Sequence, residues 1–208
     1  MISFEDLAVF FAASIALGLT PGPDNIFVLT QSALYGRLAG LIVTLGLCTG
    51  LIVHTTAVSL GVAAIFQTSA TAFNILKIFG AMYLVYLAWR AFHASASKVE
   101  LKRNTTTSMK TLYVRGFVMN ISNPKVAIFF LAFLPQFSNP STGSITIQMF
   151  ILGGLFILAT VIVFGSVAWT AGYLGQWLRT SGRAQVVMNK IAGTVFIALA
   201  IRLATAER

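Results

Sequence analysis

Residues 20–25, with the sequence Thr-Pro-Gly-Pro-Asp-Asn, interrupt an apolar run that extends from Phe4 to Leu34. A helix cannot continue through two prolines and a glycine, because each proline lacks an N–H donor and clashes with the preceding turn. Residues 120–125, Asn-Ile-Ser-Asn-Pro-Lys, interrupt a second apolar run in the same way. Pro124 follows Pro21 by 103 residues, close to half the length of the 208-residue chain. The sequence therefore predicts two helices that open at matching positions.

The composition around these interruptions is that of a membrane protein. Apolar residues make up 57% of the chain and charged residues only 9%, and the mean hydropathy is +0.87. A soluble domain carries about a quarter charged residues, so this chain cannot cover a water-exposed surface. Because a bilayer offers no water to unpaired backbone groups, each long apolar run is expected to be helical. We predict an all-α membrane protein with six transmembrane spans, at residues 4–34, 41–65, 70–92, 113–137, 145–174 and 187–203.

A polar and basic segment divides the chain into two similar parts. Residues 93–112 are rich in Ser, Thr, Lys and Arg, and they separate a first three-helix repeat (1–92) from a second (113–208). Two halves that share a fold and contain an odd number of helices must be inverted relative to each other. In each half the first helix is the interrupted one, which is the best sequence indication of a transporter substrate site.

The positions of Lys and Arg predict the orientation. They follow the first, third and fifth spans, whereas the connections at residues 67–69 and 138–144 contain none. Because basic loops stay in the cytoplasm, we expect both termini outside and residues 93–112 inside. The net charge of +9 is explained by this pattern, without a nucleic-acid partner. The first residues lack the basic region of a signal peptide, so we expect the first span to be retained.

The interruptions contain side chains suited to binding a small zwitterion. Asn123 before Pro124 has the pattern of a helix N-cap, and Asp24 lies in the first turn of the restarted helix. Such a helix N-terminus can hold a carboxylate, whereas Asp24 can attract an ammonium group or exchange a proton. The candidate substrate-binding or coupling residues are Pro21, Gly22, Pro23, Asp24, Asn25, His54, Asn120, Asn123, Pro124 and Lys125.

Several of these residues have a second interpretation. Lys125 could contact substrate, or it could reach the interface or pair with a carbonyl group. His54 could carry a proton, or it could be a neutral histidine hydrogen-bonded between helices. It continues a stripe with Gly46 and Gly50, whose small size would let another helix approach closely. The prolines by themselves could also merely kink packed helices.

Other classes of protein fit the sequence less well. The spans offer no nucleophile and base at a spacing that would place them together, so we predict that the protein is not an enzyme. Cys48 is the only cysteine, which excludes a dithiol redox centre. Well inside the spans the metal-ligating candidates are Cys48, His54 and Asp24, too few for a metal exporter or a metal site. No cofactor is expected.

Three motifs together resemble the LysE/RhtB family of bacterial amino-acid exporters. They are residues 19–25, the segment from Gly46 through Gly50 to His54, and residues 120–125 followed by Leu-Pro-Gln-Phe at 134–137. The resemblance covers essentially the whole chain, including the basic linker.

The resemblance implies a secondary transporter of the bacterial inner membrane. It would export a neutral amino acid such as threonine, homoserine, homoserine lactone or leucine, by proton antiport with alternating access. Short loops and the sequence at 202–204 favour the neutral branch over the lysine branch. The implied partners are the amino acid, protons and the lipid bilayer, and homo-oligomerisation is left open. The alternatives are export of another small solute or cation in the same superfamily, or a channel.

Overall fold

The computed structural model describes residues 2–20, 22–68, 70–94, 108–180 and 182–205. Only the backbone is described at residues 62–68, 70, 72–74, 76–77, 171–180, 182–185, 188 and 202–205. Every regular element within these ranges is a helix, which confirms the all-α prediction. In chain order they are α1 (Phe4–Leu19), α2 (Pro23–Tyr35), α3 (Arg37–Thr68), α4 (Ala70–His93), α5 (Met109–Ile121), α6 (Pro124–Ala132), the 3₁₀ helices η1 (Leu134–Phe137) and η2 (Pro140–Thr142), α7 (Ile145–Thr180) and α8 (Gly182–Thr205).

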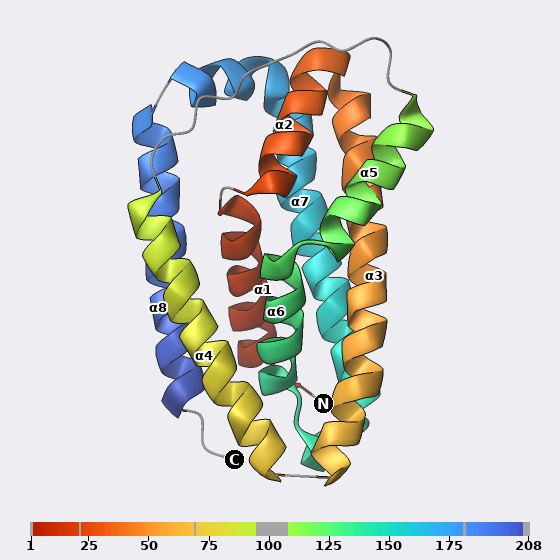
Figure 1. Cartoon of the computed structure of the whole chain (residues 1–208), viewed down its shortest axis with the longest axis vertical. Coiled ribbons are helices and arrows are strands. Elements are labelled where there is room, and N and C mark those ends of the chain that lie inside the picture. The colour runs from red at the N-terminus through yellow and green to blue at the C-terminus, as the bar shows by residue number, and fades with distance from the viewer. Residues whose placement is uncertain (1, 21, 69, 95–107, 181, 206–208) are drawn as a thin grey trace.

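The helices run up and down one elongated bundle (Figure 1). The chain climbs through α1 and α2, descends through α3, climbs through α4, descends through α5 and α6, climbs through α7 and descends through α8. By length and composition, α3 and α7 could each cross a membrane, and the number rises to four if each bent helix pair forms one span. The apolar, all-helical character is thus established, whereas six inverted spans stay a prediction.

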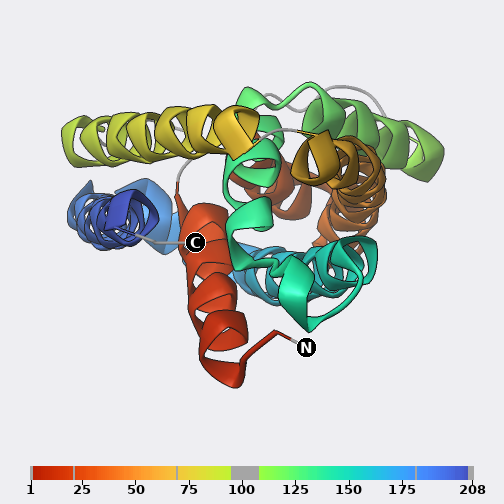
Figure 2. The same ribbon diagram turned by 90° about the horizontal axis from the view of Figure 1, so that it is seen from below.

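Both predicted interruptions are present as breaks between helices. The axes of α1 and α2 meet at 63°, and those of α5 and α6 meet at 51°. Both breaks lie near mid-height, with α2 and α5 above them and α1 and α6 below (Figure 1). Seen from below, α6 occupies the centre of the bundle (Figure 2). The two motifs, about a hundred residues apart in sequence, therefore come together inside the bundle.

The helix ends differ in detail from the apolar runs. α5 begins at Met109, four residues before the predicted span, because the Ser108 hydroxyl accepts a hydrogen bond from the Thr111 amide and caps the helix. The following apolar run continues to Phe137, but α6 ends at Ala132. Pro135 cannot donate to an α-helical carbonyl, so residues 134–137 continue as a 3₁₀ turn instead.

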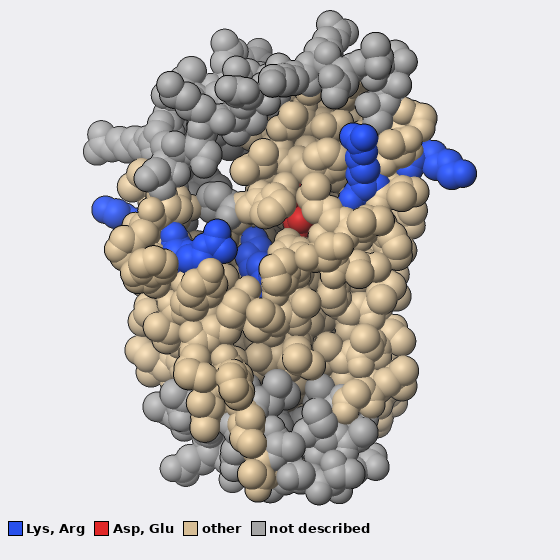
Figure 3. Space-filling view, in the orientation of Figure 1, with Lys and Arg blue, Asp and Glu red and all other residues tan. Residues whose placement is uncertain are grey.

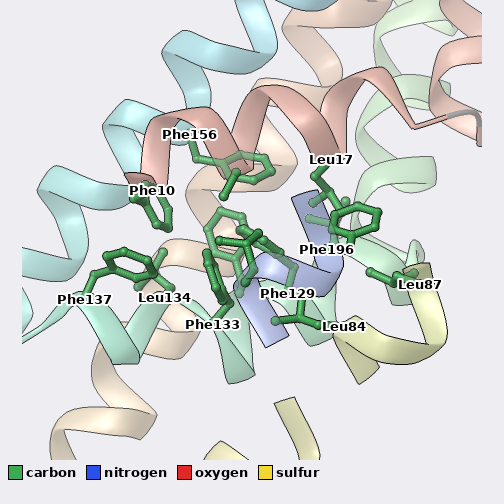
Figure 4. Close-up of a cluster of buried hydrophobic side chains, with 14 of the residues drawn as sticks. Phe10, Leu17, Leu84, Leu87, Phe129, Phe133, Leu134, Phe137, Phe156 and Phe196 are labelled. Atoms are coloured by element: carbon green, nitrogen blue, oxygen red, sulfur yellow. The ribbon is translucent and has the colours of Figure 1, made fainter. Parts of the chain in front are cut away.

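The lower half of the bundle is filled by a phenylalanine cluster. Phe10 of α1 stacks on Phe133, with ring centroids 6.2 Å apart, and meets Phe137 edge-on at 5.3 Å. Phe129 and Phe156 extend the contacts to α6 and α7. Figure 4 shows these rings converging with leucines of α1 and α4 and with Phe196 of α8. Burial of large aromatic side chains makes this region the main apolar core.

The upper half packs through glycines. A Cβ atom at Gly46 of α3 would collide with the backbone of Tyr113 and Phe117, and one at Gly116 of α5 would collide with the Val43 carbonyl. The backbones of α3 and α5 therefore touch, as small residues permit in membrane proteins. The stripe predicted on α3 serves this close packing. In contrast, a Cβ atom at Gly154 of α7 would meet open space.

This difference predicts opposite effects of the same substitution. Gly154→Ala should raise stability by about 0.5–1 kcal/mol, because alanine is the better helix former. Gly116→Ala should lower stability by about 1–3 kcal/mol, because the added methyl group forces α3 and α5 apart. The measurement is the unfolding midpoint in detergent micelles with increasing denaturant. Equal shifts for the two variants would contradict the close contact of α3 and α5.

Candidate substrate site at the two helix breaks

Asn123 connects the two breaks directly. Its side-chain oxygen accepts a hydrogen bond from the Lys125 amide at 3.0 Å, which caps α6 as the sequence predicted. Its side-chain nitrogen donates to Oδ2 of Asp24 at 2.8 Å. Asp24 lies in the first turn of α2 and is 3% exposed, and Asn123 is 6% exposed. One buried amide therefore holds the start of α6 and the start of α2 together.

Lys125 ties the same region to the end of α1. Its ammonium group donates to the carbonyl oxygens of Leu17 at 3.2 Å and Thr20 at 3.3 Å. These carbonyls belong to the last turn of α1, where the helix dipole places partial negative charge. Lys125 thus pairs with carbonyl groups, one of the two alternatives left open by the sequence, while a substrate role stays a prediction. The side chain passes close to Gly22, where a Cβ atom would lie 3.3 Å from Nζ.

Asn25 stabilises the same helix end from the other side of the break. Its side-chain nitrogen donates to the Gly18 carbonyl at 2.6 Å. Carbonyls at the end of a helix have no partner within the helix and must find one elsewhere. Asn25 and Lys125 together supply donors to three carbonyls of the last turn of α1.

Three buried oxygen atoms near the breaks have no hydrogen-bond partner within the described part of the chain. They are Oδ1 of Asp24, Oδ1 of Asn25 and Oδ1 of Asn120. Buried polar atoms are almost always paired, so unsatisfied ones call for an explanation such as a bound ligand. All three are acceptors. The breaks therefore lack hydrogen-bond donors, which an ammonium group would supply.

His54 lies beside the second break. Its Nε2 atom is 3.3 Å from the backbone oxygen of Asn120, and its ring faces Phe130 at 5.8 Å. The Asn120 side chain rests on Gly50, where a Cβ atom would come within 2.5 Å of Oδ1. His54 is thus hydrogen-bonded between α3 and α5, as one interpretation proposed, and its role in proton transfer stays a prediction.

A pocket of about 520 Å³ opens between α2 and α5 and reaches the second break. Figure 3 shows this face, on which a small acidic surface lies in a hollow among basic side chains. The lining residues are Pro23, Phe27, Val114, Arg115, Val118, Met119, Ser122, Asn123 and Pro124. Among them, Phe27, Ser122 and the four residues from 114 to 119 are missing from the sequence prediction. The four residues from 114 to 119 recur at spacings of three and four and so share one face of α5. This spacing was the signal in the sequence that could have identified them.

The structure thus gathers most of the predicted site. Gly22, Asp24, Asn25, Asn120, Asn123, Lys125 and His54 form one connected set around the two breaks, and Pro23 and Pro124 line the adjoining pocket. Pro21 lies outside the described residues. The carbonyls of Leu17, Gly18 and Thr20 were missed, because a backbone acceptor leaves no trace in sequence. In the described ranges no group of three or more His, Cys, Asp or Glu could hold a metal ion.

Opened helices that face each other within an apolar bundle, with unpaired acceptors between them, are the arrangement in which many transporters bind their substrates. The family described as LysE type translocator matches residues 15–207, and this chain belongs to that family. It is accordingly a translocator and not an enzyme.

Several curated proteins are similar to this chain over almost its entire length. The homoserine/homoserine lactone efflux proteins of Salmonella typhimurium and Salmonella typhi are 31% and 32% identical to it, and each alignment covers 99% of both chains. The uncharacterized membrane protein YrhP of Bacillus subtilis is 29% identical, over 95% of this chain and 98% of its own. No solved structure matches the chain.

The Asp24 carboxyl group and the Lys125 ammonium group are ionisable groups of opposite sign that are hydrogen-bonded into the same pair of breaks, so their contributions to stability should be coupled. Lys125→Met leaves the α1 carbonyls and Asp24 uncompensated and should cost about 3 kcal/mol of stability. The double variant with Asp24→Asn should be more stable than the sum of the single effects by about 0.5–3 kcal/mol. The measurement is denaturant unfolding in micelles, with the exposed Lys190→Met as control. Strict additivity would show that the two charges act independently.

Proposed function

We propose that this protein exports a small neutral amino acid, or its lactone, from the cytoplasm in exchange for protons. The observation that carries the proposal is the buried Asp24 carboxylate, which receives one hydrogen bond from Asn123 and keeps a second oxygen unpaired. Such a group can hold an ammonium group or a proton. The names of the two Salmonella relatives, which refer to homoserine and homoserine lactone, support the substrate class.

The exchange follows from competition for one carboxylate. A substrate ammonium group and a proton cannot both neutralise Asp24 at the same time. The deprotonated site accepts substrate from the cytoplasm, and a proton from the outside displaces it after the protein has switched. Charged groups inside a membrane are costly, so a switch that moves Asp24 away from Lys125 is favoured only when Asp24 is neutralised by one of the two. Coupling therefore needs no additional ion.

We propose six spans arranged as two inverted three-helix repeats, with both termini outside. This arrangement is supported by the climbing and descending path of the helices and by the two breaks at mid-height (Figure 1). Arg37 is the first residue of α3, at the upper end of the bundle (Figure 1). Arg37 stacks on the exposed Trp169 ring at 4.6 Å, as expected for an aromatic belt at the cytoplasmic surface. Residues 93–112 then form a cytoplasmic linker.

Alternating access is supported by the difference between the two halves of the bundle. Below the breaks, the phenylalanine cluster of α1, α6, η1 and α7 closes the path. Above them, the pocket between α2 and α5 leads to Asn123. With the basic end in the cytoplasm, this conformation is open to the cytoplasm and closed to the outside. Export requires the phenylalanine rings to separate while the upper helices close.

The orientation is tested with introduced cysteines, because Cys48 is the only native one and is buried. In a Cys48→Ala background, Met109→Cys lies at the start of α5 and Ser141→Cys lies in η2 at the opposite end. A membrane-impermeant maleimide added to spheroplasts should label position 141 and not position 109, and permeabilisation should expose both. The reverse pattern would invert the proposed topology.

Transport is tested by efflux from proteoliposomes loaded with labelled threonine, homoserine, homoserine lactone, leucine or lysine, with and without a pH gradient. The wild-type protein should release the neutral substrates in a gradient-dependent manner. Asp24→Asn should reduce this release at least about a hundredfold, because the variant can hold neither the ammonium group nor the proton. The matched control is Glu5→Gln, at an exposed position in the first turn of α1. Wild-type release by a folded Asp24→Asn variant would remove Asp24 from the mechanism.

A further inference from the structure

The pocket between α2 and α5 differs in character from the breaks themselves. Its volume of about 520 Å³ lies in the range of small-molecule sites. Most of its lining is apolar, with Phe27 on α2 facing Val114, Val118 and Met119 on α5. Polar side chains occur only at its two ends, with Arg115 at one and Ser122 and Asn123 at the other. The breaks, in contrast, are built from amides, carbonyls and charges.

The two polar ends lie about two helical turns apart along α5. Arg115 and Ser122 are separated by seven residues of α5, which corresponds to about 10 Å along the helix. A small amino acid is shorter than this distance. A substrate held near Arg115 must therefore advance along the apolar wall to reach Asn123, behind which Asp24 lies at 2.8 Å.

The charge of the lining selects among amino acids. The lining contains one cation, Arg115, and no acidic side chain. A guanidinium group binds a carboxylate with good geometry, whereas it repels a second cation. A lysine or arginine side chain would find no acceptor among the apolar residues and would lose its hydration. A neutral apolar side chain gains about fourfold in affinity for each buried methylene group.

We propose that this pocket is the selectivity site of the exporter, where an amino acid waits on its way to the breaks. Arg115 binds the substrate carboxylate, and Phe27, Val118 and Met119 bind its uncharged side chain. Asn123 separates this pocket from Asp24, and the ammonium group of the advancing substrate replaces the Asn123 amide as the donor to Asp24. The inference rests on the proposed function and adds to it the reason why cationic amino acids are rejected.

Homoserine and its lactone provide a matched pair of substrates for a test. The lactone has an ester in place of the carboxylate, so it cannot form the pair with Arg115. In proteoliposomes, Arg115→Gln should raise the KM for homoserine about fivefold, as expected for a solvent-accessible ion pair, and should leave kcat unchanged. The KM for the lactone should not rise, because Arg115→Gln removes a cation that repels the ammonium group of a substrate without a carboxylate. Arg115→Lys should restore most of the affinity for homoserine.

A second variant tests the apolar wall. Met119→Trp fills the pocket and should raise the KM for both substrates at least about tenfold, because the side-chain space is lost. Its control is Leu131→Trp, which adds the same bulk on an exposed face of α6 outside the pocket. Unfolding in micelles confirms that both variants retain the fold.

The outcomes separate this inference from the proposed function. No release of either substrate by the wild-type protein would overturn both. Wild-type release together with an unchanged KM in Met119→Trp would overturn the pocket alone and would make it a lipid-facing groove. An equal effect of Arg115→Gln on homoserine and its lactone would overturn the carboxylate contact. Efficient export of lysine by the wild-type protein would overturn the selection against cations.

Discussion

The structure depends on one constraint, which is that the backbone groups freed at a helix break inside an apolar bundle must still find partners. The last turn of α1 presents three such carbonyls, at Leu17, Gly18 and Thr20, and they accept from Lys125 and Asn25. The start of α6 is satisfied by Asn123, which also holds Asp24. Groups of the second break therefore stabilise the first.

Once the backbone groups are satisfied in this way, the side chains at the breaks have more hydrogen-bond acceptors than available donors. The available donors of Lys125, Asn25 and Asn123 are directed at carbonyls and at one oxygen of Asp24, while acceptor oxygens of Asp24, Asn25 and Asn120 stay unpaired. A purely structural break would not retain a buried carboxylate with an open acceptor, because an unsatisfied buried polar group destabilises the fold. The imbalance has the chemistry of a site for a cationic donor. In the proposed function that donor is the ammonium group of the exported amino acid.

The sequence was sufficient for features that depend on local chemistry. The two breaks follow from Pro23 and Pro124, the cap at Asn123 follows from its position before a proline, and the family follows from the motifs. The sequence was insufficient where the partner is distant or is a backbone atom. Nothing in the sequence pairs Asn123 with Asp24, 99 residues away, or directs Lys125 to the carbonyls of α1. The pocket was missed because Arg115 and Met119 line a pocket only when α2 packs beside α5.

The two breaks are chemically unequal, and this inequality suits the proposed switch between two conformations. The first break contributes the acid, and the second contributes the amide that bonds to this acid and the cation that bonds to the end of α1. Any movement of α6 relative to α1 and α2 must break the bond from Asn123 to Asp24, which alone would expose an unpaired buried carboxylate. In the proposed exchange, a bound ammonium group takes over as donor before that bond is lost, and a proton neutralises the same oxygen on the return. The occupied states then cross the barrier more readily than the empty charged state, which is the condition that coupled exchange requires.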